Sequence, residues 1–291
     1  MPEFDYYVPI TLTDLLSIMG TKGPQAKVLA GGTDLLINLK KGHISPKYVV
    51  DISQIPELKY IKDCHDYISI GTVTTINEVV CSEIINKEAA FLSEAAGLVG
   101  AQQIRNSATI GGNLVNASPA ADTVSPLAAM DAMVKILSNK GERWEYLEDF
   151  LVGPYQTRLK QDELVTELKF KKLPEGTGTN FIKLGRRKAL TISVVSIAVA
   201  LSLDENGCIK TARIAPGAVL PYPMRIRKAE ECLIGAKPEE NIFEAAGKVL
   251  ADEMIRISGR RLSTDYKKPV VKNLVQRALL KAAGRCGIHA D

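Results

Sequence analysis

Hydrophobic and polar residues follow both a helical and a strand period in the first half of the chain. Apolar residues at helical spacing predict helices over 12–19, where Thr11 can cap the first turn and Gly20 ends it, and over 88–100. A further helix start is expected at 75–80, and a small-residue helix at 125–132. Short apolar runs predict strands at 27–29, 48–52, 67–70, 108–110 and 165–170. Asn139-Lys140-Gly141 predicts a hairpin turn between strands at 134–137 and 143–146.

The second half has a simpler pattern. Large apolar residues occupy every second position from 195 to 203, which predicts the longest strand of the chain. A turn at 205–207 leads from it into a strand at 209–214. Apolar faces at helical spacing predict two closing helices, one around 242–254 and one around 271–279. Proline and glycine crowd together at 172–178. We therefore expect a domain boundary there, followed by a separate antiparallel sheet with helices packed on it.

Two pairs of glycines each follow an apolar run and precede a small hydroxyl or amide residue. They occur in AGGTDL at 30–35 and in SATIGGNL at 107–114. Glycine permits positive φ and lets a main chain approach an anion closely, so this pattern predicts two turns that clamp a phosphate-bearing cofactor. Neither turn has the lysine of a Walker A loop or the spacing of a Rossmann fingerprint. The pattern therefore favours a cofactor that is bound without being hydrolysed.

Composition narrows the class of protein. The chain has 291 residues, 46% of them hydrophobic, which suits two or three compact domains with their own cores. The formal net charge of +4 is dispersed and gives no reason to expect nucleic-acid binding. The cysteines at 64, 81, 208, 232 and 286 form no C-x-x-C pair, so their spacing predicts neither a zinc site nor an iron–sulfur cluster. No membrane span or signal peptide is expected, and we predict a cytoplasmic location.

Three motifs resemble one known family. They are VLAGGTDLL at 28–36, ATIGGNLVNASPAADTVSPLAAMDA at 108–132, and FIKLGRRKALTISVVSIAVAL at 181–201. Together they resemble the FAD-binding (medium) subunit of the molybdenum hydroxylases, the group of xanthine dehydrogenase and carbon monoxide dehydrogenase. The resemblance extends over essentially the whole chain. It implies an α+β fold, in which a vanillyl-alcohol-oxidase-type FAD domain at 1–173, with lobes at about 1–56 and 57–173, precedes a smaller α+β domain at 179–285.

The resemblance also implies which residues bind the cofactor. Residues Val28, Leu29, Ala30, Gly31, Gly32, Thr33, Asp34 and Leu35 would surround the pyrophosphate and flank the flavin, and Thr109, Ile110, Gly111, Gly112 and Asn113 would close from the other side. Asp122 would hydrogen-bond the cofactor, although its spacing suits a helix cap equally well. Ser118 lies in the same segment and would assist. Val165 would contact the adenine or flavin plane, a role that a core strand position explains equally well.

Lys183 matches a family lysine close to the flavin, and Arg186 and Arg187 follow it. A cation near N1 of a reduced flavin would favour the arrival of electrons. For the two arginines, a solvated basic edge strand is the alternative interpretation. Carbon monoxide dehydrogenases carry a tyrosine where this sequence has Thr191, which favours the xanthine dehydrogenase side of the family.

The resemblance therefore implies an electron-transfer subunit without a catalytic residue or metal ligand of its own. Its expected partners are a small subunit with 2Fe-2S clusters and a large molybdopterin subunit, assembled as a dimer of heterotrimers that acts on a purine or another N-heterocycle. NAD is one candidate for the final electron acceptor. The alternatives are a free-standing FAD-dependent reductase with the same flavin fold and a binding module without flavin.

Overall fold

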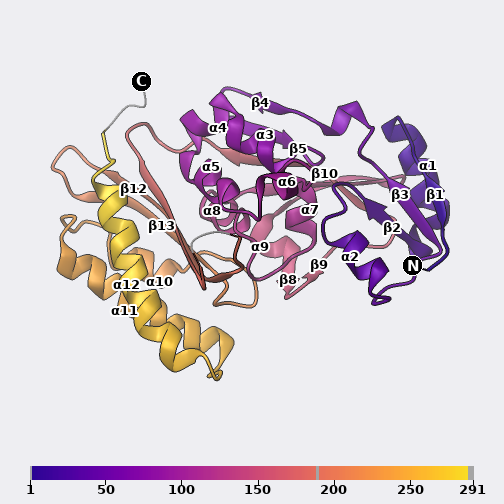
Figure 1. Cartoon of the computed structure of the whole chain (residues 1–291). Helices are drawn as coiled ribbons and strands as arrows, with labels where there is room; N and C mark the ends of the chain where they lie inside the picture. Colours follow the sequence, from indigo (N-terminus) through magenta and orange to yellow (C-terminus); the bar gives the residue numbers. More distant parts are fainter. Residues whose placement is uncertain (1, 188–189, 288–291) are drawn as a thin grey trace.

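The computed structural model describes residues 2–187 and 190–287 and has two units that lie side by side (Figure 1). The first unit contains a three-stranded sheet, a five-stranded sheet and a two-stranded ribbon, with short helices between them. The second contains a three-stranded sheet covered by two long helices. The α+β architecture expected from the sequence is confirmed.

The first lobe is built on a small parallel sheet. Its strands lie in the order β1 (Asp5–Tyr7), β3 (Tyr48–Asp51) and β2 (Ala26–Leu29), with α1 (Leu12–Lys22) and α2 (Leu35–Lys40) beside them. Thr11 caps α1 as expected, because its hydroxyl accepts a 3.1 Å hydrogen bond from the Asp14 amide. The helix does not end at Gly20. This glycine lies against the Asn139 side chain, where a Cβ would overlap, so packing explains it better than helix termination does.

The second lobe is built on an antiparallel sheet of five strands. They lie in the order β4 (Ile61–Asp63), β5 (Tyr67–Gly71), β10 (Leu164–Lys171), β6 (Met133–Ser138) and β7 (Gly141–Tyr146). The predicted hairpin of β6 and β7 is confirmed, and β8 (Leu151–Gly153) pairs with β9 (Gln156–Thr157) in the ribbon. The helices of this lobe are α3 (Ile76–Cys81), α4 (Glu83–Glu88), α5 (Ala90–Gly97), α6 (Gln102–Arg105), α7 (Ile110–Val115), α8 (Val124–Ala129) and α9 (Leu147–Phe150).

One prediction about this lobe was wrong, and another is confirmed with shorter bounds. The helix expected over 88–100 is α5, which begins at Ala90 and ends at Gly97, because Ala89 leaves the helical conformation with φ −150° and ψ 50° and Glu88 is the last residue of α4. The strand expected at 108–110 is a single bridge between Thr109 and Thr75. The chain becomes helical directly after it, because the Thr109 hydroxyl accepts a 3.1 Å hydrogen bond from the Gly112 amide and so caps α7.

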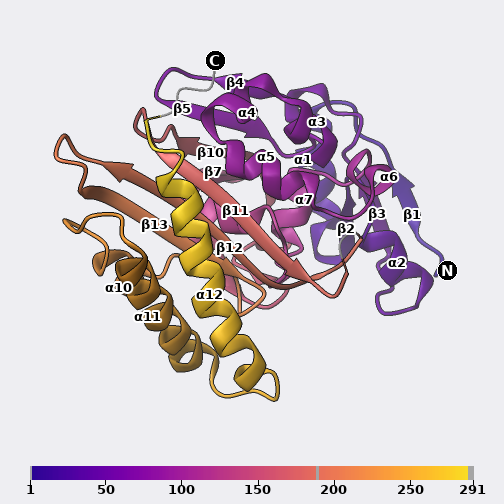
Figure 2. The same ribbon diagram turned by 60° about the vertical axis from the view of Figure 1, so that its left-hand side comes forward.

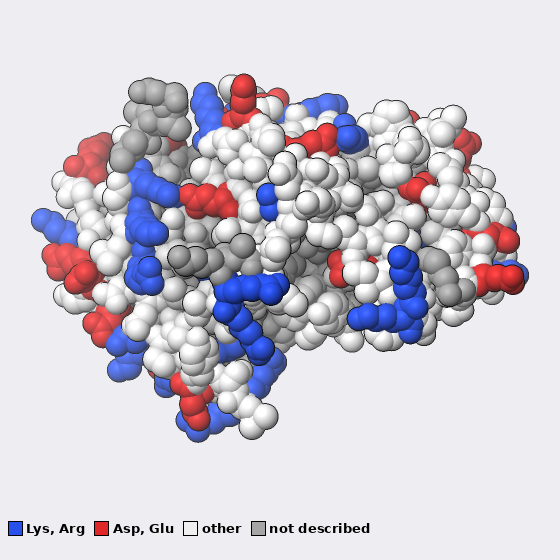
Figure 3. Space-filling view, viewed as in Figure 1, with Lys and Arg blue, Asp and Glu red and all other residues white. Residues whose placement is uncertain are grey.

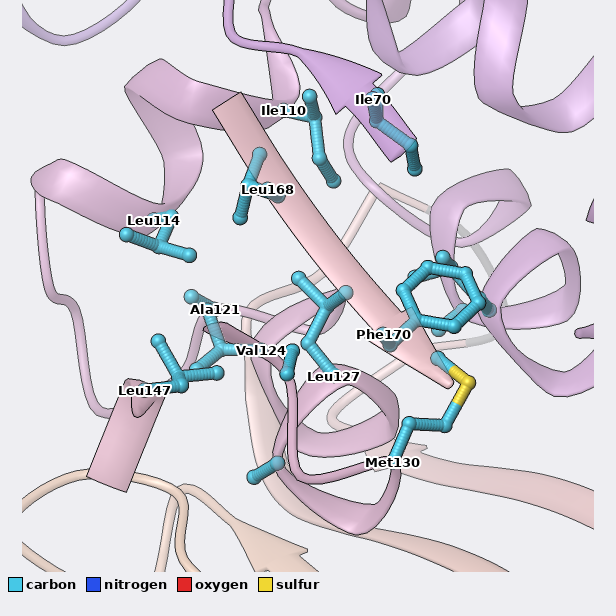
Figure 4. Close-up of a cluster of buried hydrophobic side chains, with 14 of the residues drawn as sticks. Ile70, Ile110, Leu114, Ala121, Val124, Leu127, Met130, Leu147, Leu168 and Phe170 are labelled. Atoms are coloured by element: carbon cyan, nitrogen blue, oxygen red, sulfur yellow. The ribbon is translucent and has the colours of Figure 1, made fainter. Parts of the chain in front are cut away.

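The core of the second lobe lies between the five-stranded sheet and the helices α5, α7 and α8. Figure 4 shows Leu168 and Phe170 of β10 directed toward Ile110 and Leu114 of α7 and toward Leu127 near the end of α8. The same cluster includes Phe181, Ala198 and Ala215 from the second unit. The core of the second lobe therefore extends onto the sheet of the second unit, which has a separate core on its other face.

The sheet of the second unit has different residues on its two faces. Its strands are β11 (Gly178–Gly185), β12 (Ser193–Leu203) and β13 (Ile209–Gly217), and the helices of the unit are α10 (Arg227–Glu231), α11 (Glu240–Ser258) and α12 (Thr264–Ala283). The large residues of the predicted alternation, Val195 to Leu201, pack under α11 and α12 (Figure 2). Small residues such as Ala198 alternate with them and face the first unit, so that α8 approaches the sheet closely.

On the face in Figure 3, basic and acidic side chains both occur, and several Lys and Arg side chains lie close together toward the lower left. All five cysteines are free thiols at different depths. Within residues 2–187 and 190–287, no helix has both the length and the apolar character needed to cross a membrane.

Candidate functional site

The first glycine pair forms a tight turn between β2 and α2. Gly32 has φ +70°, a conformation that favours glycine, whereas Gly31 does not have positive φ. Gly31 is required for a different reason: a Cβ there would overlap the Ser107 carbonyl and approach the Cα of Ala108 to 2.8 Å. The missing side chain therefore lets the turn lie against the segment that leads into α7.

The amides of this turn are not used within the described part of the chain. Gly31, Gly32, Thr33 and Asp34 donate no backbone hydrogen bond to any described residue, although Leu36 and Asn38 already donate back into the turn at 3.0 and 3.1 Å. Val28, Leu29 and Ala30 before it are half-buried, and Asp34 is exposed. Unbonded amides beside a half-exposed apolar strip suit an anionic group attached to an apolar one.

The second glycine pair differs from the prediction, since both residues lie in the first turn of α7 and neither has positive φ. Their amides already have acceptors: Gly111 donates to the Thr72 carbonyl at 3.0 Å and Gly112 to the Thr109 hydroxyl at 3.1 Å. Gly111 is buried against Thr72, where a Cβ would overlap the hydroxyl. Gly112 is exposed. The start of α7 therefore presents backbone without a side chain to a ligand, but no free amide of the two glycines.

Asp122 and Lys183 meet across the boundary between the two units. The Lys183 Nζ lies 2.6 Å from Oδ2 of Asp122 and donates to the Leu98 carbonyl at 2.9 Å. The Ser193 hydroxyl donates to Oδ1 of the same carboxylate at 2.5 Å. The side chains of Lys183 and Asp122 are only 6% and 7% exposed. An ammonium group has three N–H donors, so one remains for a group bound beside the pair.

The surroundings of Asp122 act on its pKa and show that it is not a helix cap. Burial raises its pKa above the ordinary value, and the Lys183 charge and the hydrogen bonds from Lys183 and Ser193 oppose that rise. The helix-cap interpretation is wrong, because Thr123 is the N-cap residue of α8 and both Asp122 oxygens are used by the second unit.

The remaining predicted residues lie around these two centres. The Asn113 side chain accepts a 2.7 Å hydrogen bond from the buried Thr123, which joins α7 to the segment before α8. The Ser118 hydroxyl accepts from the Ala120 amide at 3.3 Å and shapes that segment. Val165 is 5% exposed on β10 and belongs to the hydrophobic core. Its predicted contact with the cofactor remains a prediction.

Arg186 and Arg187 lie where β11 turns toward β12. The Arg186 amide donates to the Thr191 hydroxyl at 3.2 Å, and the Arg187 Nε donates to the Leu190 carbonyl at 3.0 Å. Both arginines are exposed. Both arginines therefore lie just beyond β11, which ends at Gly185, and their roles remain a prediction.

Sequence reasoning did not identify Ser193, Thr72 or the Leu98 carbonyl as parts of the site. Ser193 lies inside the third motif at 181–201, next to the long alternating strand. Its place in that motif was the one feature of the sequence that could have identified it. Sequence spacing could not, since its partner Asp122 is 71 residues away.

Comparison with known families matches the chain almost from end to end. Residues 2–171 match the model described as the FAD binding domain in molybdopterin dehydrogenase, and residues 180–282 match the CO dehydrogenase flavoprotein C-terminal domain. The chain belongs to the FAD-binding subunits of the molybdenum hydroxylases. FAD is accordingly the cofactor of this oxidoreductase subunit.

Individual relatives of this family of flavoprotein subunits align over nearly their whole length. The nicotinate dehydrogenase FAD-subunit of Eubacterium barkeri is 34% identical over 95% of each chain. The xanthine dehydrogenase FAD-binding subunit of Escherichia coli O157:H7 is 31% identical over 97% of each. The solved carbon monoxide dehydrogenase of Hydrogenophaga pseudoflava, which lacks the Mo-pyranopterin moiety of its cofactor, has a chain with a TM-score of 0.92 and 30% identity, covering 98% of this chain and 99% of its own.

The residues present fit FAD. The Gly31–Asp34 turn supplies unbonded amides for a pyrophosphate, and the half-buried side chains of Val28 and Leu29 supply apolar surface beside it. Lys183 and Asp122 supply a buried donor and a buried acceptor at the boundary of the two units. A dinucleotide that carries both phosphates and an aromatic ring system matches this donor set.

Proposed function

We propose that residues 28–35 and 109–113 hold the pyrophosphate of FAD, and that Asp122 and Lys183 border its flavin ring. The observation that carries the proposal is the Gly31–Asp34 turn, whose amides have no acceptor in the described chain while Gly31 packs against the Ser107 backbone. That packing brings the two glycine motifs together although they are separated by about 80 residues of sequence.

Each group in the site would have a distinct task. The turn amides would bind the phosphates, and the exposed Gly112 would leave room for them on α7. Lys183 would direct its remaining N–H at the flavin, with the ammonium held by Asp122 and the Leu98 carbonyl. When bound, FAD supplies the exchange between one-electron and two-electron transfer. The protein contributes orientation and a positive charge in a water-poor environment.

We further propose that this subunit receives electrons from the 2Fe-2S clusters of a small partner subunit, and that a large molybdopterin subunit completes the complex as a dimer of heterotrimers. The membership of the family supports this assembly. Exposed apolar side chains near both glycine motifs and near Thr191 also support it, since a partner would cover them: Leu36, Ile37, Ile104, Leu190 and Ile192. NAD is the proposed electron acceptor.

An N-heterocycle is the proposed substrate class of the complex. The relatives named for nicotinate and xanthine support it, and so does Thr191 at the position where we expect a tyrosine in carbon monoxide dehydrogenases. Substrate specificity would lie in the molybdopterin subunit, so activity of the purified complex on nicotinate, xanthine and carbon monoxide is the direct test.

The cofactor site itself is tested by two leucine substitutions in glycines of helical conformation. Gly112→Leu places a side chain on the exposed start of α7, where the new Cβ would lie 2.8 Å from Thr109 Oγ1 and this hydroxyl has to shift. Gly284→Leu is the matched control, because Gly284 is exposed at the end of α12 with φ −66° and its Cβ would lie 3.6 Å from the nearest atom. We expect both variants to fold, and only Gly112→Leu to lose flavin absorbance. Full FAD retention in Gly112→Leu would contradict the proposed site.

A further inference from the structure

A cavity of about 690 Å³ opens at the boundary between the two units, at the end of the five-stranded sheet where Tyr67 pairs with Lys171. Its walls include Tyr67, Lys169 and Lys171 at one side of the sheet and Arg213 on β13 of the second unit. A volume of several hundred Å³ is typical of sites for nucleotide-sized ligands. Neither the sequence motifs nor the family comparison assigns this cavity a role.

The cavity is distant from the glycine turns of the proposed FAD site. Thr72, which contacts Gly111, pairs with Thr166 at one end of β5 and β10, whereas Tyr67 pairs with Lys171 at the other end. Five residues of strand correspond to roughly 17 Å at about 3.3 Å per residue. A ligand in the cavity would therefore not touch the glycine turns.

The cationic groups that line the cavity are not all neutralised. Arg225 and Arg227 are engaged by carboxylates of both units. Arg213, in contrast, uses only Nη1, which donates to the Ala129 carbonyl at 3.0 Å and lies 3.1 Å from Asp131. Its Nε and Nη2 donate to no described residue. Neither atom is among the fully buried polar atoms that lack a hydrogen-bond partner. Burial lowers the pKa of Arg213, the charge of Asp131 opposes that shift, the neighbouring Arg225 adds to it, and Glu230 opposes it.

Lys171 adds a second cation to the cavity. No carboxylate in the described ranges forms an ion pair with it, and it is exposed at the end of β10. The planar edge of a guanidinium and a separate ammonium at one cavity suit the oxygens of a phosphate group.

Aromatic rings and the carboxylates of Asp131, Glu148 and Asp149 also line the cavity. Tyr67 and Tyr146 are 38% and 53% exposed, which is high for large side chains that line a cavity. The Lys169 ammonium lies 3.7 Å from the centroid of the Trp144 ring and 5.7 Å from that of Tyr67, so this lysine already bridges two rings. Exposed rings offer a flat ligand a stacking surface. A single-ring carboxylate would leave most of a 690 Å³ cavity filled with water, whereas a nucleotide would use both the rings and the cations.

We propose that this cavity binds an anionic nucleotide, with Arg213 and Lys171 holding the phosphate and Tyr67 or Tyr146 contacting the base. Asp131 of the first unit competes for Arg213, so nucleotide binding would be coupled to the contacts between the two units. The ligand would act as an effector of the contacts between the two units.

Calorimetric titration of the FAD-saturated full-length chain tests the proposal. The probes are AMP, adenosine and inorganic phosphate, which separate the contributions of ring and anion. We expect AMP to bind at least ten-fold more tightly than either adenosine or phosphate. Saturation with FAD keeps AMP out of the dinucleotide site, and flavin absorbance recorded during the titration reports any displacement of FAD.

Two lysine variants locate the binding. Lys171→Met removes the unpaired cation and should weaken AMP binding at least ten-fold, whereas Lys210→Met removes an exposed lysine of β13 outside the cavity and should not change it. Flavin content should be the same in both variants, so loss of FAD binding would be seen separately. Absence of AMP binding, equal binding of AMP and phosphate, release of FAD by AMP, or unchanged binding in Lys171→Met would each overturn the proposal.

Discussion

The Lys183 ammonium lies 2.6 Å from the Asp122 carboxylate across the boundary of the two units, and both side chains are buried. Other pairs across this boundary have the same polarity, with the acid on the first unit and the base on the second: Glu94 with Arg285 at 2.7 Å, Asp131 with Arg225 at 2.7 Å, and Glu148 with Arg227 at 2.9 Å. Because every one of these pairs has its acid on the first unit and its base on the second, together they favour one orientation of the units and hold Lys183 at the proposed cofactor site.

Breaking the Asp122–Lys183 pair from one side should be more harmful than removing it entirely. Asp122→Asn or Lys183→Met alone leaves a buried group without its partner, for which we expect a loss of about 3–5 kcal/mol in the free energy of unfolding. The double variant should recover most of that loss because no uncompensated charge remains. Urea denaturation of the four proteins measures the coupling. Additive losses would show that the pair does not act as a unit.

Ser193 should act on the cofactor through Asp122. Ser193→Ala removes a hydrogen bond to a carboxylate, typically worth about 1.5–3 kcal/mol, and frees that carboxylate to turn away from Lys183. We expect FAD affinity to fall ~10-fold and the flavin reduction potential to shift downward, since the cation is less firmly held. Fluorescence titration and spectroelectrochemistry measure the two effects.

Ser202 provides the matched control for this experiment. It is a buried serine of the same strand, and its hydroxyl lies 2.6 Å from that of Thr211, far from Asp122 along β12. Ser202→Ala removes a hydrogen bond between neutral hydroxyls, which costs about 0.5–1.5 kcal/mol of stability, and should leave both FAD affinity and potential unchanged. If the two variants behaved alike, Ser193 would have only a structural role.

Gly111 should tolerate no side chain. A Cβ at this position would overlap the Thr72 hydroxyl and lie 2.7 Å from the Thr72 carbonyl, both at the buried end of β5. Gly111→Ala should therefore lower the free energy of unfolding by roughly 1–3 kcal/mol, the usual range for overpacking. Gly284→Ala, in open helical backbone, should be neutral or slightly stabilising. The Tm of both variants tests this explanation. A loss confined to Gly111→Ala would support overpacking, whereas equal losses would show that alanine is unfavourable at either position.

Glu253 should contribute a pH-dependent part of the stability of the second unit. Hydrogen bonds from Arg256 and Lys228 lower its pKa to about 2 from an ordinary 4.5. Because the folded-state pKa is depressed, this stabilisation is complete above the unfolded pKa and is lost as pH falls toward about 2. Glu253→Gln should reduce the Tm at neutral pH, and the difference from the parent protein should shrink in acid. Glu205→Gln, in the exposed turn at 205–207, should show no such dependence.

Local patterns in the sequence predicted those elements that depend mainly on residues close together in the chain. The Thr11 cap, the β6–β7 hairpin, the long alternating strand β12 and the two closing helices could all be predicted, because each depends on neighbours within a few residues. The motifs that carry the family resemblance also lie in contiguous stretches. Family and cofactor were therefore accessible before any coordinates were known.

The tertiary structure decided what each glycine and each charge does. Gly31 and Gly111 both looked like turn residues, yet close contacts with Ser107 and Thr72 explain them, and those contacts join segments that are distant in sequence. Asp122 could have been a helix cap until Lys183 and Ser193 were seen to occupy both of its oxygens. The sequence by itself determined the family, the cofactor and most local elements of this protein. Only packing of the two units against each other decided the partners of the buried charges, because such pairing depends on distances in space that no sequence spacing encodes.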